Sequence, residues 1–278
     1  MGIFEFFNLP ASIRKILETE KKINQRIDVV QQKLTDLYCV KNQLDEMLEY
    51  SRNIWKINKQ LSHHYLDPIF NRYHKSANLR EIYLTDLFPE IADISLPLGI
   101  IHEESGHANH AEMLYLVALA KLKHAVNIFE FGTFMGQTTY YLAHSTDKTH
   151  VYTLDYDESS SQAKDRKGLY FKNTAVEDRV TVIECDSTQF DVSGFEGKMD
   201  FIFIDGGHNY GNVKNDTEKA FRMLAPSGMI VWHDYAPKSP DVSKFISEFT
   251  KQMPLFYIRK TSLILHIDGI DPLAFDLQ

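Results

Sequence analysis

The spacing of apolar residues changes once along the chain and divides it into two regions. Between about residues 11 and 64 there is no Gly and no Pro, and apolar residues recur at alternating spacings of four and three. Lys41 and Ser51 interrupt this heptad seam, which otherwise consists of Ile23, Ile27, Val30, Leu34, Leu37, Leu44, Leu48 and Trp55. The pattern predicts a long helix with one narrow apolar stripe.

A helix with so narrow a stripe needs a partner that covers it. We expect residues 1–66 to form an N-terminal helical arm, coiled-coil-like, that makes the protein a homo-oligomer. The alternative is a helical lid folded back onto the rest of its own chain. The seam mixes Ile, Val and Leu, so it does not fix the number of associating helices.

The second region starts with a connector and continues as an alternation of strands and helices. Residues 67–100 contain Pro68, Pro89 and Pro97, and short helical turns are expected within residues 78–87. Strands are then predicted at 126–131, 151–155, 180–185, 201–205, 229–233, 255–259 and 263–267, with helices at 111–124, 136–144, 158–174, 213–224 and 242–253. Residues 101–278 should therefore form an α/β domain with a Rossmann-like, doubly wound, mostly parallel seven-stranded sheet.

Composition narrows the choice of partner and compartment. The net charge of −8 argues against a nucleic-acid surface. Cys39 and Cys185 lie far apart in the sequence, and this favours a reducing compartment over a disulfide framework. Neither a secretory signal nor a transmembrane run is visible. We expect a cytoplasmic protein.

Ligands of such sheets bind outside the carboxyl ends of the strands, so the residues at those ends matter most. The first strand of the alternation ends in Glu130-Phe-Gly132-Thr133-Phe-Met-Gly136. Glycines at a strand-to-helix turn allow a tight bend and the close approach of a ligand to backbone N–H groups. Such glycines are also common without a ligand, so this loop alone is weak evidence.

The next two strands end in acids. Asp155 follows the second strand, where a carboxylate can accept hydrogen bonds from ribose hydroxyls. Asp186 and Ser187 follow the third strand, where a polar side chain can reach an adenine. Helix capping is the structural alternative for each acid. Successive acids and a glycine loop at neighbouring strand ends favour a nucleoside site.

The fourth and fifth strands end in a second kind of chemistry. Asp205-Gly-Gly-His208 follows one strand, and His233-Asp234 follows the other. Parallel neighbouring strands would bring these residues together, and carboxylates with an imidazole can hold a divalent cation. The structural alternatives are an Asx turn at Asp234 and a buried or capping His208.

These residues together resemble the class I S-adenosylmethionine-dependent methyltransferases from about residue 100 to the C-terminus. The resemblance implies that Gly132, Thr133 and Gly136 lie against the methionine part of S-adenosylmethionine and that Glu130 supports their loop. It further implies that Asp155 holds the ribose and that Asp186 and Ser187 border the adenine. Asp205 is expected to contribute to the cofactor site as well.

The segment FIDGGHNYGNVKNDTEKAFRMLAPSGMIVWHDY resembles the sugar and natural-product O-methyltransferases related to the macrolide-sugar and cephalosporin-hydroxylase-like proteins. That resemblance implies Mg²⁺ or another divalent cation on Asp205 and Asp234, with His208 as general base. His233 stands where several relatives carry Asp, and it is a further candidate ligand.

The expected function is therefore S-adenosylmethionine-dependent O-methylation of a small-molecule hydroxyl. Nucleic-acid and protein amino-methyltransferases commonly carry an Asn/Asp-Pro-Pro-aromatic turn after the fourth strand, and this chain has Asp-Gly-Gly-His instead. The alternative is a non-catalytic S-adenosylmethionine-binding protein that works in assembly through its coiled-coil arm. The acidic, histidine-bearing segment 101–107 is either a loop or a further contributor to the pocket.

Overall fold

A computed structural model describes most of the chain. The described residues are 67–96, 108–156 and 166–274, together with residues 10, 12, 13, 15–34, 37 and 41. The chain divides into two units, Met1–Leu61 and Ser62–Gln278. Several expectations lie outside the described residues, namely those for Leu44, Leu48 and Trp55 of the seam, for the segment 101–107 and for most of the helix at 158–174.

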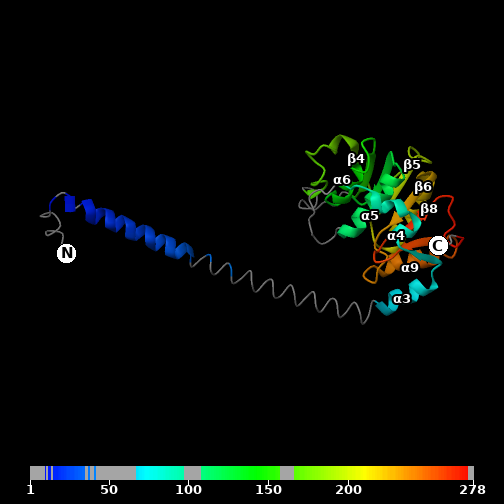
Figure 1. Cartoon of the computed structure of the whole chain (residues 1–278), viewed down its shortest axis with the longest axis horizontal. Helices are drawn as coiled ribbons and strands as arrows, with labels where there is room; N and C mark the ends of the chain where they lie inside the picture. The colour runs from blue at the N-terminus through cyan, green and yellow to red at the C-terminus, as the bar shows by residue number, and fades with distance from the viewer. Residues whose placement is uncertain are drawn as a thin grey trace. The chain divides into compact units, whose positions relative to one another are not determined.

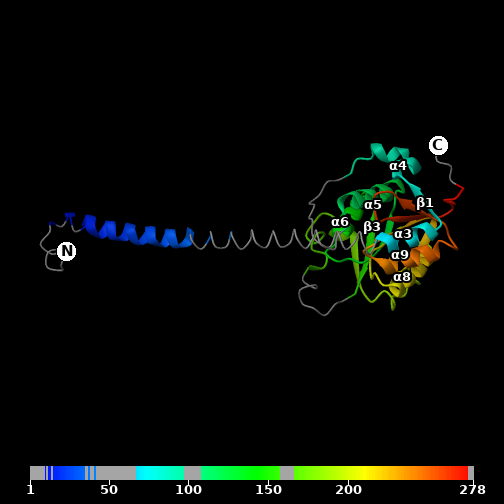
Figure 2. The ribbon, with the colours of Figure 1, turned by 90° about the horizontal axis from the view of Figure 1, so that it is seen from below.

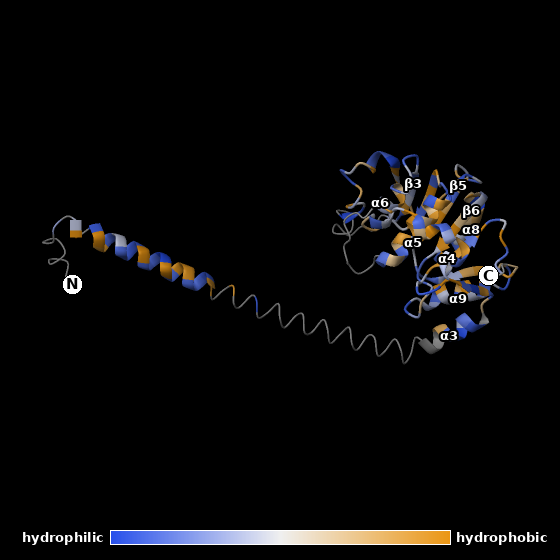
Figure 3. Cartoon of the chain, viewed as in Figure 1, coloured by the Kyte–Doolittle hydropathy of each residue, from blue (hydrophilic) through white to orange (hydrophobic). Residues whose placement is uncertain are grey.

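The described part of the N-terminal arm is helical. Residues 15–34 are α-helical throughout. Apolar and polar residues alternate along this helix (Figure 3). The described seam residues are exposed, from 47% at Ile27 to 65% at Leu37. The arm thus presents an apolar seam, and its pairing as a coiled coil stays a prediction.

The second unit is built on one eight-stranded sheet with the order β1-β7-β8-β6-β5-β2-β3-β4 (Figure 1). All neighbouring strands run parallel except that β8 is antiparallel to both β6 and β7. The strands are β1 Leu79–Ile82, β2 Asn127–Phe131, β3 His150–Asp155, β4 Val180–Glu184, β5 Met199–Ile204, β6 Leu224–Trp232, β7 Leu255–Ile258 and β8 Ile264–Ile267.

Helices cover both faces of this sheet, giving three layers (Figure 2). One face carries α4 Leu84–Leu87, α5 His110–Leu122 and α6 Gln137–Ala143. The other carries α3 Asp67–Ser76, α8 Tyr210–Met223 and α9 Pro240–Phe249. Two short 3-10 helices, Pro89–Asp93 and Glu177–Arg179, complete the described elements. Among the described residues, no helix is long and apolar enough to span a membrane.

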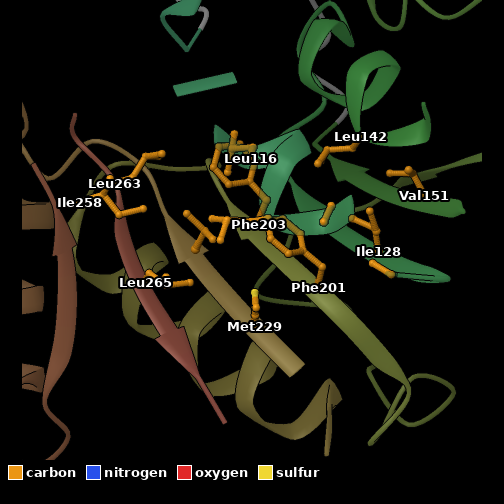
Figure 4. Close-up of a cluster of buried hydrophobic side chains, with 14 of the residues drawn as sticks. Leu116, Ile128, Leu142, Val151, Phe201, Phe203, Met229, Ile258, Leu263 and Leu265 are labelled. Atoms are coloured by element: carbon orange, nitrogen blue, oxygen red, sulfur yellow. The ribbon is translucent and has the colours of Figure 1, made fainter. Parts of the chain in front are cut away.

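The core follows from the alternation of side chains along the central strands. In β5, Phe201 and Phe203 point to the α5/α6 face, whereas Ile202 and Ile204 point to the α8/α9 face. Figure 4 shows Phe201 and Phe203 beside Leu116 of α5 within the first cluster. Because both faces are buried, the central strands read as continuous apolar runs, and the expected doubly wound sheet is confirmed.

Two sequence expectations were wrong in the described residues. Residues 79–82 form the edge strand β1, where helical turns were expected, so the sheet has eight strands and not seven. β1 pairs with β7, from which it is far removed in sequence, and this tertiary pairing overrides local preference. Residues 167–174 form turns, where a continuing helix was expected.

Gly132 follows β2 and packs against the backbone of Asp205, which follows β5. Its φ of +97° disfavours any side chain, and a Cβ there would lie 2.2 Å from the carbonyl oxygen of Asp205. That oxygen belongs to the backbone and cannot move cheaply.

We therefore expect Gly132→Ala to lower the free energy of unfolding by about 2–4 kcal/mol, measured by urea denaturation. Gly194 is the matched control, because a Cβ there would meet nothing within 4 Å. Gly194→Ala should change stability by no more than about 0.5 kcal/mol. Equal effects of the two substitutions would contradict the close-approach argument.

Candidate functional site

The candidate site lies at the carboxyl ends of β2, β3, β5 and β6. Backbone hydrogen bonds continue the ladder past the strand ends, from Gly132 N to Leu154 O at 2.8 Å and from Asp205 N to Phe131 O at 2.9 Å. His233 N donates to Ile204 O at 3.0 Å in the same way. The glycine loop and both acid–histidine pairs therefore lie along one edge of the sheet.

The loop after β2 has an unusual backbone conformation. Gly132, Phe134 and Gly136 all have positive φ, at 97°, 45° and 79°. A Cβ at Gly136 would lie 2.5 Å from the ring of Phe171, so this turn also has no room for a side chain. The Phe134 N–H donates to Oδ2 of Asp155 at 2.8 Å. The loop is thus fastened to the end of β3 by one of the predicted site acids.

Glu130 lies beneath this loop and is buried. Its Oε2 accepts hydrogen bonds from Thr139 Oγ1 at 2.5 Å and from Thr153 Oγ1 at 2.7 Å. Thr153 also pairs with Thr133 Oγ1 at 2.7 Å. Burial raises the pKa of Glu130 to about 8, against the opposing effect of the two hydroxyl donors. Glu130 is therefore a neutral acid at pH 7 that connects the loop to β3 and α6.

Asp186 and Ser187 lie after β4 and are already engaged with the protein. Oδ1 of Asp186 accepts from both N and Oγ1 of Thr188 at 2.8 Å, which forms an Asx turn. These two bonds lower the pKa of Asp186. The Ser187 carbonyl accepts hydrogen bonds from the side chains of Asn215 and Lys219. The geometry defines a turn at this strand end, and a contact with adenine stays a prediction.

The acid–histidine cluster forms as the strand order predicts. Asp205, His208 and Asp234 each offer a ligand atom, and these atoms lie within 4.8 Å of one another. His208 Nε2 lies 2.6 Å from Oδ2 of Asp234, and the His208 side chain is 57% exposed. Asp234 has a φ of 62°, a strained conformation for a non-glycine residue. The imidazole of His208 is therefore exposed to solvent, whereas the carboxylate of Asp234 that it contacts is buried.

The pKa values of this pair are coupled. The hydrogen bond to Asp234 raises the pKa of His208, with burial opposing it. Burial alone would raise the pKa of Asp234, but hydrogen bonds from His208 and His233 hold it far below its usual range. Asp234 is thus a carboxylate at every pH of interest.

His233 is buried between acids from different elements. Its Nδ1 lies 2.9 Å from Oδ1 of Asp205, and its Nε2 lies 3.2 Å from Oε2 of Glu112. Burial opposes a charge on His233, but Asp205, Asp234 and Glu112 outweigh burial and raise its pKa to about 12. His233 is therefore an imidazolium whose two N–H groups both donate. Its role as a metal ligand stays a prediction and requires one of these bonds to break.

Glu112 is a site residue that the sequence analysis missed. It is the third residue of α5, where it forms a capping box with Asn109. The same carboxylate accepts from N and Oγ of Ser262 at 2.5 and 2.8 Å, and it faces His233. Burial acts against its charge, but the donors from His233 and Ser262 outweigh burial and lower its pKa to about 2. The sequence around Glu112 predicts only the helix cap and gives no sign of the contact with His233.

Lys238 is the second residue that was missed. Its Nζ lies 2.7 Å from Oδ1 of Asp234. That oxygen is buried, and Lys238 is the partner that the structure gives it. Two carboxylates and an imidazole make a donor set that fits a divalent cation.

A comparison with protein families decides the class of this domain. Residues 129–235 match the family model described as a methyltransferase domain. The match runs from β2 past Asp234 and so contains the glycine loop and the acid–histidine cluster. The matched segment is a methyltransferase domain.

Solved structures similar to this methyltransferase include other methyltransferases. One is an O-methyltransferase from Streptomyces achromogenes that is involved in tomaymycin synthesis, in complex with S-adenosylmethionine. The two sequences are 15% identical, the match covers 67% of this chain and 97% of that chain, and the TM-score is 0.46. Another is an O-methyltransferase from Bacillus cereus in complex with S-adenosylhomocysteine, with 20% identity, coverage of 77% and 97%, and a TM-score of 0.47. No curated protein matches the sequence.

The protonation of Glu130 gives a testable prediction for the methyltransferase. Its pKa is about 8 in the folded protein and about 4.5 in the unfolded chain, so the folded protein holds this proton more tightly. Its contribution to the free energy of unfolding is complete below pH 4.5 and is lost as pH rises from 4.5 toward 8. Glu130→Gln keeps an oxygen for the hydroxyl donors of Thr139 and Thr153 without a charge to bury.

We expect the free energy of unfolding of Glu130→Gln, relative to the unsubstituted protein, to increase between pH 5 and pH 8. Urea denaturation at several pH values measures this difference, in which the other titrating groups cancel. Glu130→Ala leaves two buried hydroxyls without their acceptor and should cost about 2–4 kcal/mol at pH 5. Parallel pH curves for Glu130→Gln and the unsubstituted protein would rule out a neutral Glu130.

Proposed function

We propose that this methyltransferase transfers the methyl group of S-adenosylmethionine to a hydroxyl group of a small molecule, a sugar or another natural product. The observation that carries the proposal is the Asp205–His208–Asp234 cluster at the same sheet edge as the glycine loop. An amine acceptor needs no such paired acids beside an imidazole, whereas a hydroxyl must lose a proton as it is methylated.

The cofactor site follows from the neighbouring strand ends. Gly132, Thr133 and Gly136 form the turn against which the methionine part of the cofactor is proposed to lie. Asp155 uses Oδ2 to hold this turn, which leaves its Oδ1 for a ribose hydroxyl. The adenine is proposed to lie near Asp186 and Ser187. In this arrangement, backbone N–H groups bind the methionine part of the cofactor and one carboxylate binds its ribose.

His208 is proposed as the general base. The acceptor hydroxyl loses its proton to this imidazole, and Asp234 stabilises the imidazolium that forms. The 2.6 Å contact holds the ring in place before the reaction. The exposed position of His208 leaves it accessible to an acceptor, whereas the buried His233 already carries a proton on each nitrogen. These two histidines therefore have different roles.

Asp205 and Asp234 are the proposed ligands of a divalent cation such as Mg²⁺. A cation bound there would polarise the acceptor oxygen and lower the pKa of the hydroxyl. The protein's own contribution is to hold both acids in place at the sheet edge. His233 does this for Asp205, because its Nδ1 donates to Oδ1 of that acid.

Calorimetric titration with S-adenosylhomocysteine, with Mg²⁺ and then with chelator, tests the cofactor site. We expect saturable binding at about one per chain. Asp155→Ala removes both the proposed ribose acceptor and the anchor of the loop, so it should weaken binding by about tenfold or more. His208→Ala should bind S-adenosylhomocysteine like the unsubstituted protein, yet lose methyl transfer to any accepted hydroxyl compound.

Asp191 provides the matched control for Asp155. It is an exposed acid that closes a turn with Ser193 away from the strand ends. Asp191→Ala should bind S-adenosylhomocysteine normally. No binding by the folded, unsubstituted protein would overturn the proposed cofactor site. Unchanged methyl transfer in His208→Ala would remove that residue from the reaction.

The helical arm is proposed to associate with a second copy of itself. Its exposed seam is the supporting observation, since Ile27 and Val30 lie on the stripe and are 47% and 55% exposed. Val29 is equally apolar and 56% exposed, but it lies off the stripe. Apolar residues at a and d positions stabilise a coiled coil only when they face a partner.

Light scattering after size exclusion tests this association. The unsubstituted protein should have the mass of an oligomer, and the double substitution Ile27→Lys with Val30→Lys should give the monomer mass. Val29→Lys introduces the same charge off the seam and should leave the oligomer intact. A monomeric unsubstituted protein, or an oligomer that survives the seam substitutions, would refute the proposal.

A further inference from the structure

Asp234 is surrounded by nitrogen-bearing side chains of the protein itself. His208 lies 2.6 Å from its Oδ2, and Nδ1 of His233 lies 3.5 Å from the same oxygen. Lys238 Nζ lies 2.7 Å from Oδ1. Each oxygen of this proposed metal ligand therefore already has a nitrogen partner from the protein, and the partner of Oδ1 is the Lys238 ammonium.

The contact between Lys238 and Asp234 differs from the contacts that the histidines make. Oδ1 of Asp234 is buried, and the Lys238 ammonium group lies at ion-pair distance from it. Both histidines contact the other oxygen, Oδ2, so Lys238 is the partner of Oδ1. The Asp234 side chain is 6% exposed, which separates this pair from the weak ion pairs of an open surface.

Lys238 is free to leave this position without disturbing the fold. It lies before α9, whose first residue is Pro240, and its side chain is 66% exposed. A lysine ammonium is a point charge on a flexible stem, so it can exchange one carboxylate oxygen for water. Asp234 has no such freedom, since its position follows directly from β6.

We propose that Lys238 is a tethered counter-ion that competes with a divalent cation for Oδ1 of Asp234 and so sets the metal affinity of the site. The proposal rests on the proposed function, because it concerns the same two acids. An ammonium and a divalent cation repel each other and cannot both contact one buried oxygen. Metal binding therefore requires the Lys238 side chain to swing out to solvent.

Binding of Mn²⁺ alone, measured from the electron paramagnetic resonance signal of the free ion, tests the competition. Lys238→Met keeps the length of the side chain and removes the charge, and it should bind Mn²⁺ at least about tenfold more tightly than the unsubstituted protein. Lys238→Arg keeps the charge and should bind Mn²⁺ weakly. Adding Asp234→Asn to Lys238→Met should abolish the gain, which places the gain at this carboxylate.

Lys251→Met is the control for a general change in protein charge, since Lys251 is an exposed lysine that follows α9. It should bind Mn²⁺ like the unsubstituted protein. Equal affinity of Lys238→Met and the unsubstituted protein, or no Mn²⁺ binding by either, would overturn the proposal. The same samples are also titrated with S-adenosylhomocysteine. A failure of the proposed cofactor site would appear as a loss of S-adenosylhomocysteine binding and would not change the comparison of Mn²⁺ affinities.

Discussion

The candidate site depends on the buried imidazolium of His233, because that one side chain connects elements that are distant in sequence. Its two N–H groups donate to Asp205 at the end of β5 and to Glu112 at the start of α5. Glu112 in turn accepts both donors of Ser262, in the turn between β7 and β8. Buried charges of this kind are tolerated only when they are paired and fully hydrogen-bonded. The positions of Asp205 and α5 are therefore coupled, and a change at either would leave a buried charge without its partner.

Much of this architecture could be predicted from the sequence, because it depends on local pattern. The apolar runs around Phe201 and Val231 predict buried parallel strands, and the strand order brings Asp205 and Asp234 to one edge. Glycine at 132 likewise predicts a tight turn, and its φ and its distance from Asp205 explain why no other residue fits. These features share one property: the sequence around each residue already carries the signal.

The remaining features depend on contacts that no local pattern contains. Glu112 looks like a helix cap in sequence, and it is one, but its second role with His233 spans 121 positions. Lys238 follows an acid in a turn, where a lysine is unremarkable until the burial of its partner is known. Residues 79–82 became a strand only through pairing with β7. Each of these features arises from tertiary contacts, which override local preference or give one residue a second role.

The edge strand β1 also has a consequence for how the domain can be divided. β7 has β8 on one side and β1 on the other, so β1 covers a row of backbone N–H and C=O groups that would otherwise be open. A fragment starting at residue 101 would contain the whole region matched by the family model, yet it would expose this row. Uncovered sheet edges recruit strands from other molecules. By the same argument, a fragment that keeps this edge of β7 covered must include β1 and so begin before residue 79.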